Sequence, residues 1–195
     1  AVFVENTNLR PAAVFGAGPI GNMAAQWLRS LGCGTIVVVD IDDSKLDLAQ
    51  AMGFATANPK AGDPAAAIAG LCGKDGADKV IEACGLPLTY RQALQSAGRF
   101  GEVVFLGNIS GDFVLSSKEM SAVLRKELKL HGTWNSRIAP RGQDDWSTVL
   151  DHLGRDLDVA PLISHTPSLA GGADIFARIV SKQIAINKVV FKLES

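Results

Sequence analysis

The stretch FGAGPIGNMAAQWLRSLG, residues Phe15 to Gly32, decides the fold of this chain. It contains three glycines, Gly16, Gly18 and Gly21, in the spacing G-x-G-x-x-G. A short apolar run comes directly before the first glycine. From Pro19 to Leu31 the apolar residues follow a helical pattern that predicts one buried face, made of Ile20, Ala24, Trp27, Leu28 and Leu31. This order predicts a strand, a tight turn and then a helix.

Each glycine has a mechanical role in such a unit, which is typical of dinucleotide-binding folds. Gly16 lets the chain turn out of the strand, Gly18 lets a pyrophosphate approach the backbone, and Gly21 lets the helix pack closely on the sheet. The helix directs free N–H groups and a partial positive charge at the phosphates. Asp40 follows the β-branched run TIVVV, 19 residues after Gly21. A carboxylate there accepts hydrogen bonds from the adenosine ribose and repels a 2′-phosphate, so we predict a site for NAD rather than NADP.

Strand and helix patterns alternate along most of the chain. Strands separated by helices of this length imply right-handed crossovers and a parallel sheet, so we predict an α/β fold with a doubly wound parallel (Rossmann) sheet. After Asp158 the pattern changes to a proline, a loop, one helix and a last strand. The predicted strands are Ala12–Phe15, Thr35–Asp40, Phe54–Thr56, Asp78–Gly85 with its turn, Glu102–Leu106, 128–134 and Lys188–Leu193. The predicted helices are Pro19–Leu31, 44–52 with Ser44 as its cap, Pro64–Leu71, Pro87–Ala97, Ser117–Glu127 and Asp144–Leu153.

Composition excludes several classes of partner. The 195 residues suit one domain, or one domain with part of another. A net charge of −1, from 19 basic and 20 acidic residues, does not favour nucleic acid or an anionic membrane. No apolar run is long enough to span a membrane, and the first ten residues lack a secretory pattern, so we expect a cytoplasmic protein. Cys33, Cys72 and Cys84 are widely spaced, which favours buried free thiols in a reducing compartment.

Several catalytic motifs are absent from the sequence. Tyr90 is followed four residues later by Leu94 rather than lysine, and no P-loop, G-x-S-x-G or H-E-x-x-H motif occurs. The three histidines are scattered, which favours surface or packing roles over metal binding. His131 lies in a strand pattern beside Gly132, so its role is left open. Four aspartates have the positions of helix-start charges: Asp42, Asp43, Asp144 and Asp145. The residues therefore predict a cofactor site without catalytic machinery.

Five segments resemble the medium-chain, zinc-dependent alcohol and polyol dehydrogenases in sequence and order: GAGPIG, VVVDIDDSKLDLA, EACG, VVFLGN and LRKELKLHGTWNS. The segments LGNISGDFVLS and LRKELKLHGTWNS are especially similar to the sugar-alcohol branch and its galactitol-1-phosphate 5-dehydrogenases. The resemblance implies that a GroES-like catalytic domain with the zinc ligands belongs upstream, outside this chain. We expect residues 1–160 to be an NAD-binding Rossmann domain, residues 161–195 to be a return segment toward the missing catalytic domain, and the fragment alone to be inactive.

The resemblance also assigns roles around the predicted site. Ile20 would pack beneath the pyrophosphate, and Lys45 would lie near the adenosine ribose or be a solvated helix residue. The turns Leu106–Asn108 and Thr133–Asn135 would contact the nicotinamide half, although Trp134 could equally serve packing or a dimer surface. Apart from the resemblance, the turns Ala83–Leu86 and Leu106–Asn108 each follow a predicted strand, so each would line the nicotinamide half or be an ordinary loop. The predicted cofactor-binding residues are Gly16, Gly18, Pro19, Ile20, Gly21, Asp40, Lys45, Cys84, Gly85, Leu106, Gly107, Asn108, Thr133, Trp134 and Asn135, and no catalytic or metal-binding residue is predicted.

The activity implied for the parent protein is transfer of a hydride from a secondary alcohol, in a sugar alcohol or its phosphate, to NAD⁺, with zinc polarising the hydroxyl. A homodimer is the implied assembly. One alternative is a stand-alone dinucleotide-sensing module, which would carry the same glycine loop and Asp40. The tail from Pro161 to Leu193 argues against it. Another alternative is a quinone reductase without zinc. Those enzymes usually favour NADP, and Asp40 argues against that.

Overall fold

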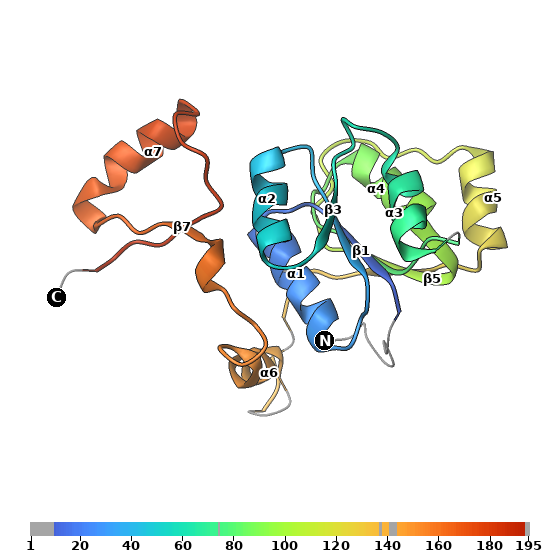
Figure 1. The fold of residues 1–195 in the computed structure, drawn as a ribbon, viewed down its shortest axis with the longest axis horizontal. Helices are drawn as coiled ribbons and strands as arrows, with labels where there is room; N and C mark the ends of the chain where they lie inside the picture. Colours follow the sequence, from blue (N-terminus) through green and yellow to red (C-terminus); the bar gives the residue numbers. More distant parts are fainter. Residues whose placement is uncertain (1–9, 74, 137, 141–143, 194–195) are drawn as a thin grey trace.

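The chain folds around a six-stranded parallel sheet in this computed structural model, which describes residues 10–73, 75–136, 138–140 and 144–193 (Figure 1). The strand order is β3-β2-β1-β4-β5-β6, and every neighbouring pair is parallel. The winding direction reverses between β1 and β4, which confirms the predicted doubly wound fold. The elements of this part are β1 (Ala12–Phe15), α1 (Pro19–Ser30), β2 (Ile36–Val39), α2 (Asp43–Ala51), β3 (Ala55–Ala57), α3 (Pro64–Cys72), β4 (Ala77–Glu82), α4 (Pro87–Ser96), β5 (Ala97–Phe105), α5 (Ser117–Arg125) and β6 (Lys129–Gly132).

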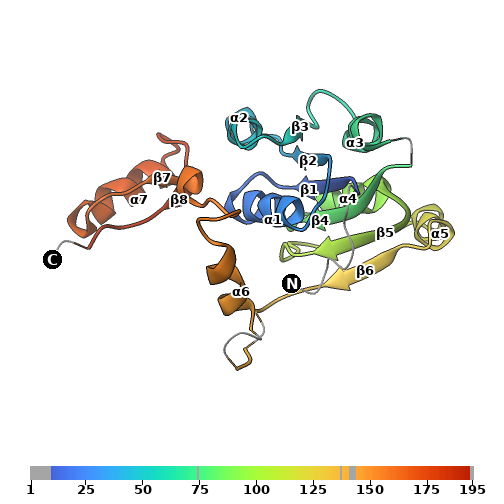
Figure 2. The same ribbon diagram turned by 60° about the horizontal axis from the view of Figure 1, so that its bottom comes forward.

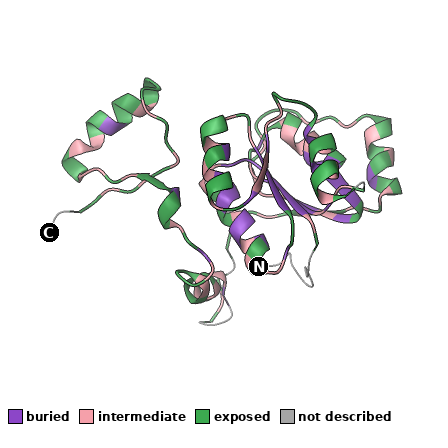
Figure 3. Ribbon diagram, in the orientation of Figure 1, coloured by how far each residue is buried: buried purple, intermediate pink, exposed green. Residues whose placement is uncertain are grey.

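Helices cover both faces of the sheet, and the core lies between the layers. Along β1, Ala12 and Val14 belong to the cluster with α1 and α2, whereas Ala13 and Phe15 belong to the cluster with α3, α4 and α5. All four residues are buried, because a central parallel strand has apolar neighbours on both sides. Figure 3 shows this burial concentrated in the sheet and in the helix faces that touch it.

The buried face of α1 differs from the predicted apolar stripe of Ile20, Ala24, Trp27, Leu28 and Leu31. Ile20 is 54% exposed, whereas the amide side chains of Asn22 and Gln26 are buried. Of the predicted stripe, only Leu28 is fully buried. The helix packs on the sheet through small residues, and its larger apolar side chains border a cavity of about 330 Å³ toward α6 (Asp145–His152).

The start of α2 is a second difference. Ser44 was the predicted cap, but the helix begins at Asp43, and Oδ1 of Asp42 accepts a hydrogen bond from the N–H of Ser44 at 3.0 Å. Asp144 caps α6 in the same way, accepting from the N–H of Ser147 at 2.7 Å. The prediction that these aspartates lie at helix starts is confirmed.

Strand β5 also begins earlier than predicted. Ala97 already pairs with Ala77 of β4 before an irregularity shifts the register, and regular pairing resumes at Lys79 and Glu102. Phe100 adopts a left-handed φ of 59° within this irregular stretch. The predicted start at Glu102 therefore corresponds to the regular part of the strand.

The chain continues beyond α6 into a small separate unit. Its elements are η1 (Ala160–Leu162), β7 (Ile163–His165), η2 (Leu169–Gly171), α7 (Gly172–Val180) and β8 (Lys188–Val189). Strands β7 and β8 form their own two-stranded parallel sheet, so the predicted last strand is paired, although shorter than expected. Figures 1 and 2 both place this unit beside the main sheet rather than on it, and α7 leaves Phe176 and Val180 exposed.

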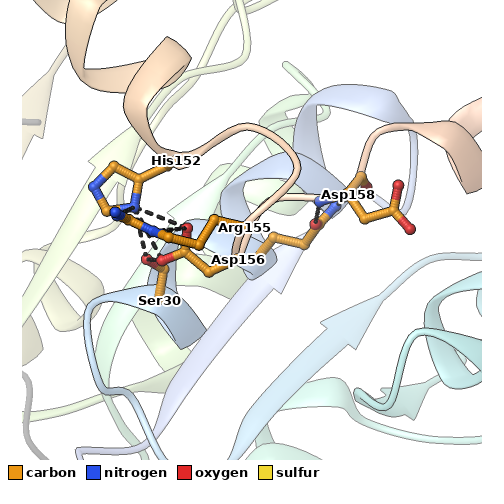
Figure 4. A network of polar contacts seen from close by, with 6 residues as sticks. Ser30, His152, Arg155, Asp156 and Asp158 are labelled. Carbon is orange, nitrogen blue, oxygen red and sulfur yellow. Dashed lines mark hydrogen bonds and ion pairs between the residues drawn. The ribbon is translucent and has the colours of Figure 1, made fainter.

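Side-chain contacts fasten the chain after α6 to α1. The buried amide of Gln26 donates to the carbonyl of Asp158 at 2.9 Å and accepts from its N–H at 2.6 Å. Nearby, Ser30 donates to the carboxylate of Asp156, and Nδ1 of His152 lies 2.9 Å from that carboxylate (Figure 4). Gln26 and Ser30 of α1 are thus paired with a segment more than 120 positions away.

Candidate dinucleotide-binding site

The glycine loop is closely packed on one side and open on the other. A Cβ on Gly21 would lie 1.8 Å from the carbonyl oxygen of Gly16, so helix and loop touch through bare backbone. Gly16 has a left-handed φ of 105°, and a Cβ there would meet the sulfur of Cys84 at 3.0 Å. A Cβ on Gly18 would meet no atom within 4 Å. The space above Gly18 is therefore free, as a pyrophosphate requires.

In the described part of the chain, the N-cap of α1 makes no side-chain hydrogen bond to the first turn. Gly18 is its N-cap and has no side chain with which to accept a bond, and Pro19 occupies the first helical turn. The N–H groups of this turn and the helix dipole together favour an anion. Ile20, which was predicted to lie beneath a pyrophosphate, is exposed at this same end.

Asn22 supports the loop and was missed in the sequence. Its fully buried side-chain amide donates to the carbonyls of Ala17 at 2.6 Å and of Gly18 at 3.3 Å. These bonds fix the two loop carbonyls to a side chain of the helix that follows. The sequence did contain an indication of this role, because Asn22 is a polar residue directly after Gly21, on a helix face that must be buried.

Asp40 lies at the end of β2 and is bound to the glycine loop. Its Oδ2 accepts from the N–H of Ala17 at 2.8 Å, and its Oδ1 accepts from the N–H of Asp42 at 3.0 Å. Two backbone donors therefore fix the orientation of the carboxylate beside the loop. Each oxygen keeps a lone pair for a further donor, such as a ribose hydroxyl.

Lys45 and Cys84 lie near the same carboxylate. Burial and then the charges of Glu82 and Asp40 raise the pKa of the Cys84 thiol to about 12, against smaller opposing effects of a hydrogen bond to Thr89 and of the Lys45 charge. Lys45 is half-buried rather than fully solvated. The expectation of buried thiols holds for Cys33 but is wrong for Cys84, which as a whole residue is exposed.

The turns after β4 and β5 touch each other through backbone atoms. Gly85 has a φ of 75°, and a Cβ on it would lie 2.2 Å from the carbonyl oxygen of Asn108. A Cβ on Gly107 would lie 2.3 Å from the nitrogen of Gly85. The hydroxyl of Tyr90 donates to the carbonyl of Gly107 at 2.8 Å. These two predicted site segments therefore form one rigid surface at the carboxyl edge of the sheet.

The predicted segment after β6 is placed at the same edge but is less enclosed. The N–H of Thr133 donates to the carbonyl of Phe105 at 3.3 Å, and Thr133 and Leu106 both line the cavity between α1 and α6. Trp134 is 73% exposed, and Asn135 is also exposed. The structure thus gathers the glycine loop, Asp40 and both glycine turns, and leaves Trp134 and Asn135 at the surface.

Comparison with known proteins places the chain in a family. The family model described as zinc-binding dehydrogenase matches residues 19–155. This chain belongs to the zinc-binding dehydrogenase family. The resemblance noted in the sequence is confirmed, including its likeness to galactitol-1-phosphate 5-dehydrogenase.

Relatives of this chain include galactitol 1-phosphate 5-dehydrogenase of Escherichia coli K12, which is 30% identical over 97% of the chain and 53% of the relative. L-threonine 3-dehydrogenase of Anaeromyxobacter sp. strain K is 32% identical over 80% of the chain and 44% of the relative. The crystal structure of galactitol-1-phosphate dehydrogenase from Escherichia coli superposes with a TM-score of 0.79 at 28% identity, covering 94% of this chain and 54% of that one. The chain spans about half the length of the relatives it matches.

The described part of this chain does not fit a zinc ion. No group of three histidine, cysteine, aspartate or glutamate side chains lies close enough there to hold a metal. Ser30, His152 and Asp156 do not form a nucleophilic triad either, because the serine and the carboxylate both lie at the same nitrogen, Nδ1.

Among the described residues, no helix is long and apolar enough to cross a membrane.

Proposed function

We propose that this chain is the NAD-binding part of a zinc-dependent dehydrogenase that oxidises a secondary alcohol in a sugar alcohol or its phosphate. The observation that carries the proposal is the joining of Asp40 to the glycine loop through the N–H of Ala17, beside the open space above Gly18. A dinucleotide needs an acceptor for its ribose hydroxyls and a cradle for its phosphates next to each other at one edge of the sheet.

The preference for NAD over NADP follows from charge. The Asp40 carboxylate would accept from the ribose hydroxyls, and its charge would repel the 2′-phosphate of NADP. Gly18 and the first turn of α1 would hold the pyrophosphate, with Ile20 beneath it and Lys45 near the ribose. The turns carrying Cys84, Gly85 and 106–108, and then 133–135, would border the nicotinamide half.

The bound cofactor would supply the hydride acceptor. This chain's own residues would bind and orient it and exclude water from one face of the ring. Since the described residues do not fit zinc, we assign the metal and substrate hydroxyl to a catalytic domain outside this chain. On that basis we place the domain boundary near residue 160 and expect the chain to act in a homodimeric parent protein.

A sugar-alcohol phosphate is the favoured substrate class. The galactitol 1-phosphate relative aligns over 97% of the chain, including the unit after α6, whereas the L-threonine relative aligns over 80%. An amino alcohol such as L-threonine is the competing class.

The test has two arms. Calorimetric titration of the chain should show a higher affinity for NAD⁺ than for NADP⁺. An activity assay of the same chain should show no turnover of any polyol. Turnover by the chain alone would contradict the missing-domain proposal. Expression from the complete coding region should give NAD⁺ reduction with galactitol 1-phosphate above that with galactitol or L-threonine. A preference for L-threonine would overturn the substrate class and leave NAD binding intact.

A further inference from the structure

Glu82, the last residue of β4, is fully buried, and it binds the two turns that are predicted to border the nicotinamide. Its Oε1 accepts three hydrogen bonds, from the N–H of Cys84 at 2.9 Å, the N–H of Gly85 at 2.9 Å and the hydroxyl of Thr89 at 2.6 Å. All three donors are neutral groups. Three such bonds stabilise a carboxylate anion without cancelling its charge.

The backbone of the same residue holds the neighbouring turn. The carbonyl oxygen of Glu82 accepts from the N–H groups of Leu106 and Gly107, each at 2.9 Å. Glu82 therefore fixes the turn after β4 with its side chain and the turn after β5 with its main chain. A change confined to its side chain leaves the second set of bonds available.

The second carboxylate oxygen, Oε2, has no hydrogen-bond partner within the described part of the chain, and it would lie 2.8 Å from a Cβ on Gly107. Among the described residues, no lysine, arginine or histidine forms an ion pair with Glu82. A buried charge without a counter-ion is weakly screened, so it acts over a longer range than a surface carboxylate.

The charge of Glu82 reaches groups at the edge of the site. It raises the pKa of the Cys84 thiol and the pKa of the Tyr90 phenol. In both cases burial is the larger cause and the charge of Glu82 is the second. Cys84 lies in the turn after β4, and Tyr90 binds the carbonyl of Gly107 in the turn after β5.

We propose that Glu82 sets the redox preference of the site, because its buried, unpaired negative charge favours the cationic nicotinamide ring of NAD⁺ over the neutral ring of NADH. The inference rests on the proposed function, in which these two turns border the nicotinamide. Oxidation of an alcohol to a ketone begins with NAD⁺ bound, so such a charge would suit that direction. Glu82 is a positioning and electrostatic residue in this view, not a catalytic one.

The test is the ratio of dissociation constants for NAD⁺ and NADH, measured by titration of the protein. Glu82→Gln keeps an acceptor oxygen and the side-chain shape but removes the charge. We expect it to weaken NAD⁺ relative to NADH by about tenfold. Thr89→Val is the matched variant, since it removes one bond to Oε1 and keeps the charge. It should weaken both forms equally, and Glu127→Gln, an exposed carboxylate, should change neither.

Each outcome has one meaning. If the wild type binds neither form, the proposed function fails and not only this inference. If the wild type binds both and Glu82→Gln leaves the ratio unchanged, the charge has no role and the inference is overturned. If Glu82→Gln does not fold, ¹³C NMR of the unmodified protein labelled at its six glutamate carboxyls decides. A Glu82 carboxylate that is ionised at pH 7 supports the inference, and a protonated one overturns it.

Discussion

The N–H of Ala17 donates a 2.8 Å hydrogen bond to Oδ2 of Asp40, across 23 positions of sequence. This bond joins the glycine loop to the end of β2. The carboxylate that would read the ribose therefore also holds the loop that would cradle the phosphates.

Replacing Asp40 separates these two roles. Asp40→Gly should raise the affinity for NADP⁺ relative to NAD⁺ by about tenfold, because the repulsion of the 2′-phosphate is lost. It should also weaken NAD⁺ itself, since Ala17 loses its acceptor. Asp40→Asn keeps an acceptor oxygen and removes only the charge. It should therefore also raise the relative affinity for NADP⁺, but it should weaken NAD⁺ less than Asp40→Gly does. Titration with both dinucleotides measures this, and unchanged affinities in both variants would remove Asp40 from the site.

Two neighbouring glycines should respond differently to the same change. Gly21→Ala puts a Cβ 1.8 Å from a backbone oxygen and should destabilise the fold by at least about 2 kcal/mol. Gly18→Ala enters open space at a φ of −71° and should change the unfolding free energy by less than about 1 kcal/mol. Gly18→Ala should nevertheless reduce NAD⁺ affinity. Urea unfolding and titration on both variants test this, and full NAD⁺ affinity in Gly18→Ala would contradict a phosphate position above that residue.

Cys84 should be an unreactive thiol despite its exposed position. A pKa raised from 9.0 to about 12 leaves about a thousandfold less thiolate near pH 8. Alkylation by iodoacetamide should therefore be slow at pH 8 and accelerate only as the pH approaches 12. The unfolded chain provides the reference rate. Rapid alkylation of Cys84 in the folded protein at pH 8 would mean that its surroundings are not those described.

Glu119 should make stability depend on pH in the acid range. Hydrogen bonds from the N–H and hydroxyl of Ser116, followed by Arg91, lower the pKa of Glu119 from 4.5 to about 2. Because the pKa is lower in the folded state, the stabilisation is complete above about pH 4.5 and is lost as the pH falls toward 2. Glu119→Gln should thus be less stable than the wild type at pH 7, and the difference should shrink between pH 4.5 and 2. A difference that is constant across this range would exclude the carboxylate as its source.

The sequence was sufficient for features that are local in the chain. The glycine spacing and the strand before Asp40 predicted the first unit, and Asp40 is bonded to the glycine loop that the same motif contains. Alternating apolar runs predicted the order of strands and helices, because each run must be covered on both faces.

Features that depend on distant partners were not predictable in this way. Gln26 looks like a solvent-facing residue until the backbone of Asp158, 132 positions later, satisfies its amide. Asn22 is likewise buried because loop carbonyls lie above it. Glu82 was predicted only as part of the strand and turn Asp78–Gly85 and of the segment EACG, because its three hydrogen-bond donors lie in a turn whose path the sequence does not specify. The exposure of Ile20 was not predicted, because α1 packs on the sheet through small residues such as Gly21 and Ala25. Hydropathy alone favours the larger apolar side chains for the packed face.

The backbone contact between Gly85 and Gly107 limits how this protein can vary. In most packed sites a larger residue is tolerated if a neighbour becomes smaller, so two substitutions can restore what one has broken. Here the atom nearest to each missing Cβ is main chain, the oxygen of Asn108 for Gly85 and the nitrogen of Gly85 for Gly107, so a smaller side chain elsewhere cannot remove the closest clash. A library of double variants should therefore contain no second-site suppressors for bulky residues at position 107, while suppressors should be recoverable for changes in the apolar core.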